Sequence, residues 1–213
     1  MEHWDICVVG AGAAGLMCAI EAGKRGRRVL VLDHSAKPAE KIRISGGGRC
    51  NFTNLDIQPE RFLSQNQHFA KSVLNRYTQY DFIDMVRQAG LSFHEKTLGQ
   101  LFCDTSSKDI VQMLLSALAE TGGRLRLNTA VSAVVQNNGY ILQTEQGALR
   151  CDSLVVATGG KSIPKMGASG WGYQIAQQFG LRLVETRPAL VPLTFAEQDL
   201  GRVKPLAGIS VSA

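Results

Sequence analysis

Short apolar runs alternate with helical patterns in the first part of the chain. An apolar run over residues 6–9 leads directly into a glycine-rich turn at 10–15, and a helical pattern follows over 13–25. A second apolar run over 29–32 ends on Asp33. A strand, a glycine turn, a helix and a parallel strand in this order predict a βαβ unit of the kind that binds dinucleotides.

The middle of the chain has the pattern of helices separated by one hairpin. Apolar spacing predicts helices over 61–77 and 80–88, and the residues between turn signals predict a hairpin over 91–103. A further helix is expected to begin at Ser106 or Ser107, because either hydroxyl can cap the free amides of a first helical turn.

A β-meander and a buried strand are predicted next. Three short β-patterned runs are separated by turn signals, of which Asn138-Gly139 is the strongest. A nearly continuous apolar run follows, as expected for a strand buried on both faces, and then a helix. These elements are expected at residues 125–135, 140–144, 148–151, 153–157 and 173–179. Together with the first unit they predict an α/β fold with a parallel sheet.

The pattern changes after residue 187. The run over 190–193 contains a proline and suits a central strand poorly. Residues 203–213 form a new extended run that ends without a turn or a cap. We therefore expect one domain over 1–187 and the truncated start of a second, β-rich domain over 188–213. An unpaired last strand would leave a sheet edge through which copies of the chain could associate.

Composition and charge exclude several classes of protein. Of 213 residues, 45% are hydrophobic and 19% are charged, which is ordinary for a globular protein, and the net charge of +5 is mild. The one basic cluster, at 24–28, lies where a helix should end, so a nucleic-acid partner is not expected. Five scattered cysteines form no CxxC pair, and neither a metal site nor a redox disulfide is expected. No membrane span is predicted, and we expect a cytoplasmic location.

Each part of the first unit has a chemical role in binding a dinucleotide. Gly10 lets the chain turn sharply off the strand, and Gly15 lets the helix pack closely on the sheet. A side chain at Gly12 would block a pyrophosphate from the backbone amides at the helix N-terminus. Asp33 can accept hydrogen bonds from a ribose diol. This pattern alone does not separate FAD from a nicotinamide coenzyme, because both contain an ADP half.

Two further glycine clusters, expected at strand ends, favour a flavin over a simple nicotinamide domain. Residues 46–48 lie in a segment, 41–54, with no clear helix or strand pattern, and residues 159–160 end the buried strand. The first of these clusters precedes Arg49, and backbone amides beside a guanidinium suit an anion or a planar ring. Cys50 has no partner cysteine or neighbouring base, which favours a packing role over a nucleophilic one.

Three segments carry a resemblance to a known family. They are DICVVGAGAAGLMCAIEAGKRG, KIRISGGGRCNFTN and VVATGGKSIPKMGASGWGYQIAQQFG. The chain resembles the bacterial NAD(P)/FAD-dependent oxidoreductases of the BaiN-like (YhiN-like) family, whose members are often labelled aminoacetone oxidase family FAD-binding enzymes. The resemblance implies a Rossmann-like FAD-binding domain of the glutathione-reductase type with a β-meander, into which a β-rich domain is inserted.

The resemblance also implies which residues hold FAD. The first glycine turn would bind the pyrophosphate, Asp33 the adenosine ribose, the 41–51 segment the pyrophosphate and ring end, and Val131 the adenine through its backbone. The full set is Gly10, Gly12, Ala13, Ala14, Gly15, Asp33, Lys41, Ser45, Gly46, Gly47, Gly48, Arg49, Cys50, Asn51, Val131, Thr158, Gly159 and Gly160. The chain departs from the family in having Asp33 where many members have Glu, and Leu101-Phe102-Cys103 where a Val-Phe-Pro string is usual. The segment that returns from the inserted domain to complete the flavin site is absent from this sequence.

The function implied is a flavin-dependent oxidoreductase. NAD(P)H would deliver electrons to FAD, and a small organic molecule or oxygen would accept them, by reduction of an enone or oxidation of an amine. The alternatives are a FAD-dependent tRNA-modifying protein and a non-catalytic FAD-binding fragment. No catalytic acid or base is assigned: His94 is expected at the surface, His34 near the adenosine end, and Trp171 and Tyr173 either over the flavin or packed in their own loop.

Overall fold

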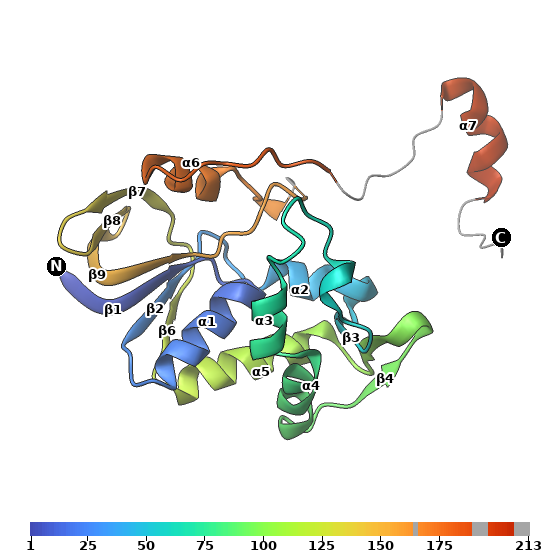
Figure 1. Ribbon diagram of the computed structural model, residues 1–213, viewed down its shortest axis with the longest axis horizontal. Coiled ribbons are helices and arrows are strands. Elements are labelled where there is room, and N and C mark those ends of the chain that lie inside the picture. Colours follow the sequence, from blue (N-terminus) through green and yellow to red (C-terminus); the bar gives the residue numbers. More distant parts are fainter. Residues whose placement is uncertain (164–165, 189–195, 207–213) are drawn as a thin grey trace.

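The computed structural model describes residues 1–163, 166–188 and 196–206. Its main layer is a six-stranded sheet in the order β6-β2-β1-β9-β8-β7, and a smaller sheet has the order β3-β5-β4 (Figure 1). The four strands β6, β2, β1 and β9 run parallel, while β7 and β8 pair antiparallel with their neighbours. The predicted α/β fold with a meander is confirmed.

The helices and strands have the following bounds. The strands are β1 Glu2–Val9, β2 Val29–Leu32, β3 Asn51–Asn54, β4 Phe93–Glu95, β5 Gln100–Cys103, β6 Arg124–Arg126, β7 Val131–Gln136, β8 Tyr140–Thr144 and β9 Gly147–Val156. The α-helices are α1 Ala13–Gly23, α2 Glu40–Ile44, α3 Lys71–Arg76, α4 Gln79–Gln88, α5 Ser107–Glu120, α6 Trp171–Gln178 and α7 Glu197–Val203. Short 3-10 turns include η1 Ser45–Gly48, η2 Pro59–Arg61, η3 Thr97–Gly99 and η5 Lys204–Leu206.

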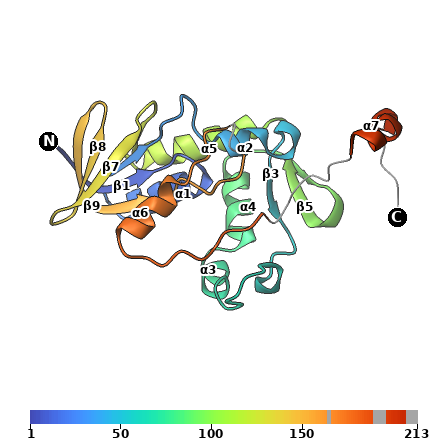
Figure 2. The same ribbon diagram turned by 90° about the horizontal axis from the view of Figure 1, so that it is seen from above.

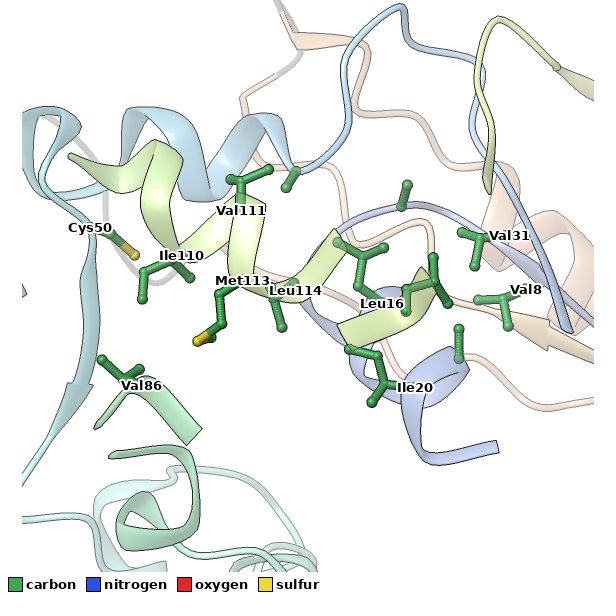
Figure 3. Packing of buried hydrophobic residues seen from close by; sticks show 14 of the residues in the cluster. Val8, Leu16, Ile20, Val31, Cys50, Val86, Ile110, Val111, Met113 and Leu114 are labelled. Carbon is green, nitrogen blue, oxygen red and sulfur yellow. The ribbon is translucent and has the colours of Figure 1, made fainter. Parts of the chain in front are cut away.

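One face of the main sheet is covered by α1 and α5. Val8 and Val31, from neighbouring parallel strands, pack in one cluster with Leu16 of α1 and Leu114 of α5 (Figure 3). All four side chains are essentially inaccessible to solvent. Burying a Val or Leu side chain contributes about 1.5–3 kcal/mol, so this cluster fixes α1, and with it the glycine turn, against the sheet.

Side chains on the opposite face of β1 and β2 pack with residues of the meander strands and of α6. Cys7 and Leu30 point into a second cluster with Leu142 of β8 and Ile175 of α6. The structure corrects two predicted boundaries here. The two runs predicted at 148–151 and 153–157 form one strand, β9, because its first half pairs with both β8 and β1. The single strand predicted over 125–135 is instead two, β6 and β7, because residues 127–130 leave the strand conformation and Asn128 has a φ of 49°.

The smaller sheet and its helices contain the largest error of the sequence-based prediction. The hairpin over 91–103 and the helix over 80–88 are confirmed, and Ser106 rather than Ser107 caps α5. The helix predicted over 61–77 is wrong, since only 71–76 is α-helical. None of its residues is buried, and an amphipathic pattern without a packed face gains little stability as a helix.

Near the C-terminus the structure differs from the predicted extended run. Residues 203–206 are helical, in α7 and the turn that follows it, whereas 207–213 lie outside the described residues. The domain boundary at 187/188 therefore stays a prediction.

Among the described residues, no helix combines the length and hydropathy needed to cross a membrane. The same residues contain no group of three His, Cys, Asp or Glu side chains placed to hold a metal ion.

Candidate FAD-binding site

The first glycine turn is packed too closely to admit side chains at two of its positions. Gly10 has a φ of 111°, and a Cβ there would lie 2.4 Å from the carbonyl oxygen of Ala157, which follows β9. A Cβ on Gly15 would lie 1.9 Å from the carbonyl oxygen of Gly10. The turn, the start of α1 and the end of β9 are thus in direct backbone contact at the carboxyl end of the parallel strands, where ligands bind in such sheets.

Gly12 differs from its neighbours because it faces open space. A Cβ built on Gly12 has no atom within 4 Å, and Gly12 is the N-cap of α1 without any side-chain hydrogen bond. The next two residues, Ala13 and Ala14, are exposed. A helix N-terminus leaves its first amides without intrahelical partners and carries partial positive charge. The space beside Gly12 therefore fits a pyrophosphate, and the contact between this turn and a pyrophosphate stays a prediction.

Asp33 is held in place by two backbone amides. Its Oδ2 accepts a hydrogen bond from the Ala11 N–H at 2.7 Å, and its Oδ1 accepts one from the Ser35 N–H at 2.8 Å. The carboxylate is largely buried, with 14% of its side chain exposed. Each carboxylate oxygen has two lone-pair sites, so Oδ2 keeps one for a ribose hydroxyl, whereas the His34 Nδ1 lies 3.6 Å from Oδ1. Asp33 therefore both closes the glycine turn and presents an oriented acceptor.

The segment between β6 and β7 lies beside Asp33. The Thr129 N–H donates to the Asp33 carbonyl at 2.8 Å, and the Asn128 N–H donates to the Ser35 carbonyl at 3.1 Å. Val131 begins β7 two residues later, with a register shift before Ala133. This arrangement brings Val131 close to the end of β2, as a contact with adenine would require, and that contact stays a prediction.

The loop after β9 is enclosed by α2 and α6. The Lys41 ammonium donates to the Ser162 hydroxyl at 2.7 Å and lies 3.5 Å from where a Cβ of Gly159 would stand. On the other side, a Cβ on Gly160 would be 2.9 Å from the Tyr173 hydroxyl. The structure thus brings Lys41 and the loop beginning at Thr158 together beside the first glycine turn.

The second glycine cluster is displaced from the position expected for it. Residues 46–48 follow the short helix α2 in a 3-10 turn, and they do not end a strand of the parallel sheet. All three glycines have positive φ, and a Cβ on Gly46 would lie 2.6 Å from the ring of Phe102. Gly47 and Gly48 face open space and precede the exposed Arg49. The segment 41–54, predicted to be irregular, is a helix, a turn and the strand β3.

Helix α2 connects the two glycine turns. The Ala39 N–H donates to the Ala11 carbonyl at 2.9 Å, so the start of α2 touches the first turn. Its five residues span about 7.5 Å at 1.5 Å per residue. The Ser107 hydroxyl holds the other end through the Arg43 carbonyl at 2.7 Å. An elongated ligand with phosphates at Gly12 can therefore extend along α2 toward the second glycine turn.

The two cysteines near this region, Cys50 and Cys103, are poor nucleophiles. Burial raises the pKa of the Cys50 thiol, and a hydrogen bond with Ser45 only partly opposes this. Burial, together with the neighbouring Cys50, raises the pKa of Cys103 to about 11. Both thiols are buried in the core, which agrees with the packing role expected for Cys50. His94 is exposed, as expected, and its Nδ1 lies 2.6 Å from Asp104.

Two features of the site escaped the sequence-based prediction. Ser162 is the partner of Lys41, and the Ala11 amide is the partner of Asp33. Both depend on contacts across the fold that no local pattern indicates. Tyr173, expected either over the flavin or packed in its own loop, lies beside Gly160 of the loop after β9. His34 lies 2.7 Å from a Cβ placed on Gly167, so it also contacts that loop.

The fold and this site together define a Rossmann-type FAD-binding α/β domain. The structure resembles the open conformation of a flavocytochrome c3 fumarate reductase, with a TM-score of 0.58 and 21% identity, over 84% of this chain and 41% of the other. Residues 4–212 match the HI0933-like protein Rossmann domain, and the chain belongs to that family.

Two curated relatives align with nearly the whole chain. The ribosomal RNA dihydrouridine synthase of Escherichia coli (strain K12) is 50% identical over 99% of this chain and 53% of its own length. The 3-dehydro-bile acid delta(4,6)-reductase of Clostridium scindens (strain ATCC 35704 / DSM 5676 / VPI 13733 / 19) is 24% identical over 98% of this chain and 51% of its own length. The chain spans about half the length of these relatives.

We expect Asp33→Ala to weaken FAD binding by roughly 10- to 100-fold, because hydrogen bonds to charged groups contribute about 1.5–3 kcal/mol. The dissociation constant can be measured from flavin fluorescence during titration with the protein. Asp5→Ala is the matched control, since Asp5 also accepts a hydrogen bond from a backbone amide, that of Arg28 at 2.9 Å, near the start of β2. An Asp33→Ala protein with unchanged affinity would show that Asp33 does not hold the ribose.

Proposed function

We propose that this chain is the FAD-binding part of an enzyme that reduces a carbon–carbon double bond conjugated to a carbonyl group, with a uracil base in RNA as its substrate. The observation that carries the proposal is the open, uncapped helix N-terminus at Gly12 beside the oriented carboxylate of Asp33. When bound, FAD supplies two-electron hydride chemistry that no side chain of the chain provides.

The names of the two curated relatives support this reaction class. One is a dihydrouridine synthase acting on ribosomal RNA, and the other a delta(4,6)-reductase of a 3-dehydro bile acid. Both names describe the saturation of carbon–carbon double bonds. In uracil, the C5=C6 bond is conjugated to the C4 carbonyl, so it is an activated alkene like an enone. The higher identity to the RNA-modifying relative favours uracil over a steroid-like enone.

The residues of this chain would bind and orient the cofactor. The amides at Gly12, Ala13 and Ala14 would hold the pyrophosphate, and Asp33 the ribose. Lys41 of α2, whose ammonium reaches the loop after β9, would place a positive charge beside the cofactor. A fixed cation near a flavin stabilises the negative charge that accumulates on reduction. NAD(P)H is proposed as the electron donor.

The experiment measures dihydrouridine in ribosomal RNA. The full-length protein from the gene that carries this chain, loaded with FAD, is incubated with ribosomal RNA from cells that lack the gene, and with NADH or NADPH. Mass spectrometry of the digested RNA should show a uridine that gains two mass units, dependent on the coenzyme. Unmodified RNA together with coenzyme-dependent reduction of a steroid enone would overturn the uracil assignment. Oxygen-dependent oxidation of an amine, with no alkene reduced, would overturn the reaction class.

A further inference from the structure

Within residues 1–163, 166–188 and 196–206, the exposed aromatic side chains are confined to one segment. Among the described residues, the Phe, Tyr and Trp side chains classed as exposed are Phe62, Phe69, Tyr77 and Tyr80. Phe69 is 75% exposed. All four lie within residues 61–80, which include α3 and are called here the α3 surface. Figure 2 shows this segment projecting from the body of the domain. Apolar groups gathered on an exposed surface mark a site of interaction.

The α3 surface contains no acidic residue. Its twenty residues include Arg61, Lys71, Arg76 and His68, together with several amide side chains. Arg61 pairs with Asp56 just outside the segment. Among the described residues, neither Lys71 nor Arg76 forms an ion pair with a carboxylate. Two cations are therefore available to an anionic partner, although the net charge of the whole chain is mild.

A hollow beside α3 combines apolar and polar walls. It has a volume of about 330 Å³, and its apolar lining includes Pro59, Phe62 and Leu63. Its polar lining includes Gln67 and Lys71, which can donate hydrogen bonds, and Glu60, which can accept them. A planar base with donors and acceptors on its edge matches this lining better than an aliphatic chain does.

We propose that the α3 surface binds a single-stranded stretch of RNA, with bases stacked on its aromatic rings and phosphates placed beside Lys71 and Arg76. This proposal rests on the proposed function, in which a uracil in RNA is the substrate. Proteins that bind single strands combine aromatic platforms with a cationic track, and sequence tolerance follows because every base has a π-face. The α3 surface would hold the strand that carries the substrate base, at a place separate from the FAD-binding residues.

Charge complementarity selects RNA over an apolar partner. A second copy of this chain, docked through its own α3 surface, would have to desolvate Lys71 and Arg76 without a carboxylate of that segment to pair with them. A phosphate backbone supplies an anion at each nucleotide, and the amide side chains of Gln65, Asn66 and Gln67 offer hydrogen bonds to bases. Single-stranded regions are also where bases can be recognised from their edges.

The test measures binding without turnover. Fluorescence anisotropy of a labelled oligouridylate of about 12 nucleotides is followed during titration with the FAD-loaded full-length protein at several salt concentrations. Phe69→Ala should weaken binding by about tenfold without changing the salt dependence. Lys71→Ala should reduce the slope of log K against log salt by roughly 0.7. Two exposed residues elsewhere serve as matched controls, Leu98→Ala and Lys108→Ala, and both should stay within about twofold of the parent protein.

The outcomes separate this proposal from the proposed function. Loss of affinity in both α3-surface variants, with native melting temperatures, supports it. Unchanged RNA affinity in both variants overturns it, even if dihydrouridine is formed. A change in the sedimentation coefficient of Phe69→Ala, with RNA binding intact, also overturns it, because the surface would then contact a second copy. RNA binding that depends on these residues, in a protein that leaves uridine unmodified, would overturn the proposed function and leave the surface assigned.

Discussion

Replacing Gly12 with Ala is expected to weaken FAD binding by at least about 100-fold while leaving the fold intact. Gly12 has a φ of −83°, which any residue adopts, and a Cβ there would meet no protein atom. The added methyl group would occupy the space in which a pyrophosphate approaches the amides of α1. Loss of two charge-assisted hydrogen bonds, at about 1.5–3 kcal/mol each, corresponds to that loss of affinity.

Two measurements on the same protein check this expectation. Titration with FAD gives the dissociation constant, and thermal unfolding in the absence of FAD gives the melting temperature. Gly201→Ala is the matched control, because Gly201 also faces open space with an ordinary φ but lies in α7. If Gly12→Ala bound FAD as tightly as the parent protein, the pyrophosphate would have to lie elsewhere. A fall in melting temperature would show instead that the turn does not tolerate the methyl group.

The βαβ unit could be predicted from the sequence because its signals are local and agree with one another. The apolar run before Gly10, the helical period after Gly12 and the apolar run ending at Asp33 each specify one element, and the short connections leave one arrangement. The 61–77 region shows the limit of this reasoning. Its apolar spacing resembles a helix, but no face is buried, and periodicity alone does not reveal whether a partner surface exists.

The candidate site could likewise be predicted from the sequence only where its signals are local. A turn that needs positive φ can be predicted from glycines in the sequence, since few other residues adopt that conformation. Gly10, Gly46 and Gly159 have positive φ here. Contacts between distant segments leave no such signal. The pairing of Lys41 with Ser162 spans 121 positions and arises because α2 and the loop after β9 meet beside the same glycine turn. The exposure of the aromatic residues on the α3 surface was not predicted, because most of that segment was expected to form an ordinary helix.

Replacing Gly15 with Ala is expected to have the opposite pattern of effects from Gly12→Ala. Ala is the better helix former by about 1 kcal/mol, yet its Cβ would lie 1.9 Å from the Gly10 carbonyl oxygen and 3.3 Å from the Val8 side chain. Relieving that overlap requires α1 to move away from the sheet, and we take about 3 kcal/mol, the upper end of the usual cost of overpacking. The net loss of about 2 kcal/mol should lower the melting temperature by roughly 4–8 °C.

The contrast between the two substitutions is more informative than either alone. Both add one methyl group within the same turn, three residues apart, so composition and charge are matched. If the turn binds the cofactor, Gly15→Ala should have a lower melting temperature than the parent protein without FAD, while Gly12→Ala should melt at the parent temperature. Gly12→Ala should then differ from the parent protein in its dissociation constant for FAD. Were both substitutions to lower only the melting temperature, the glycines would serve packing alone, and the open space beside Gly12 would not be a pyrophosphate site.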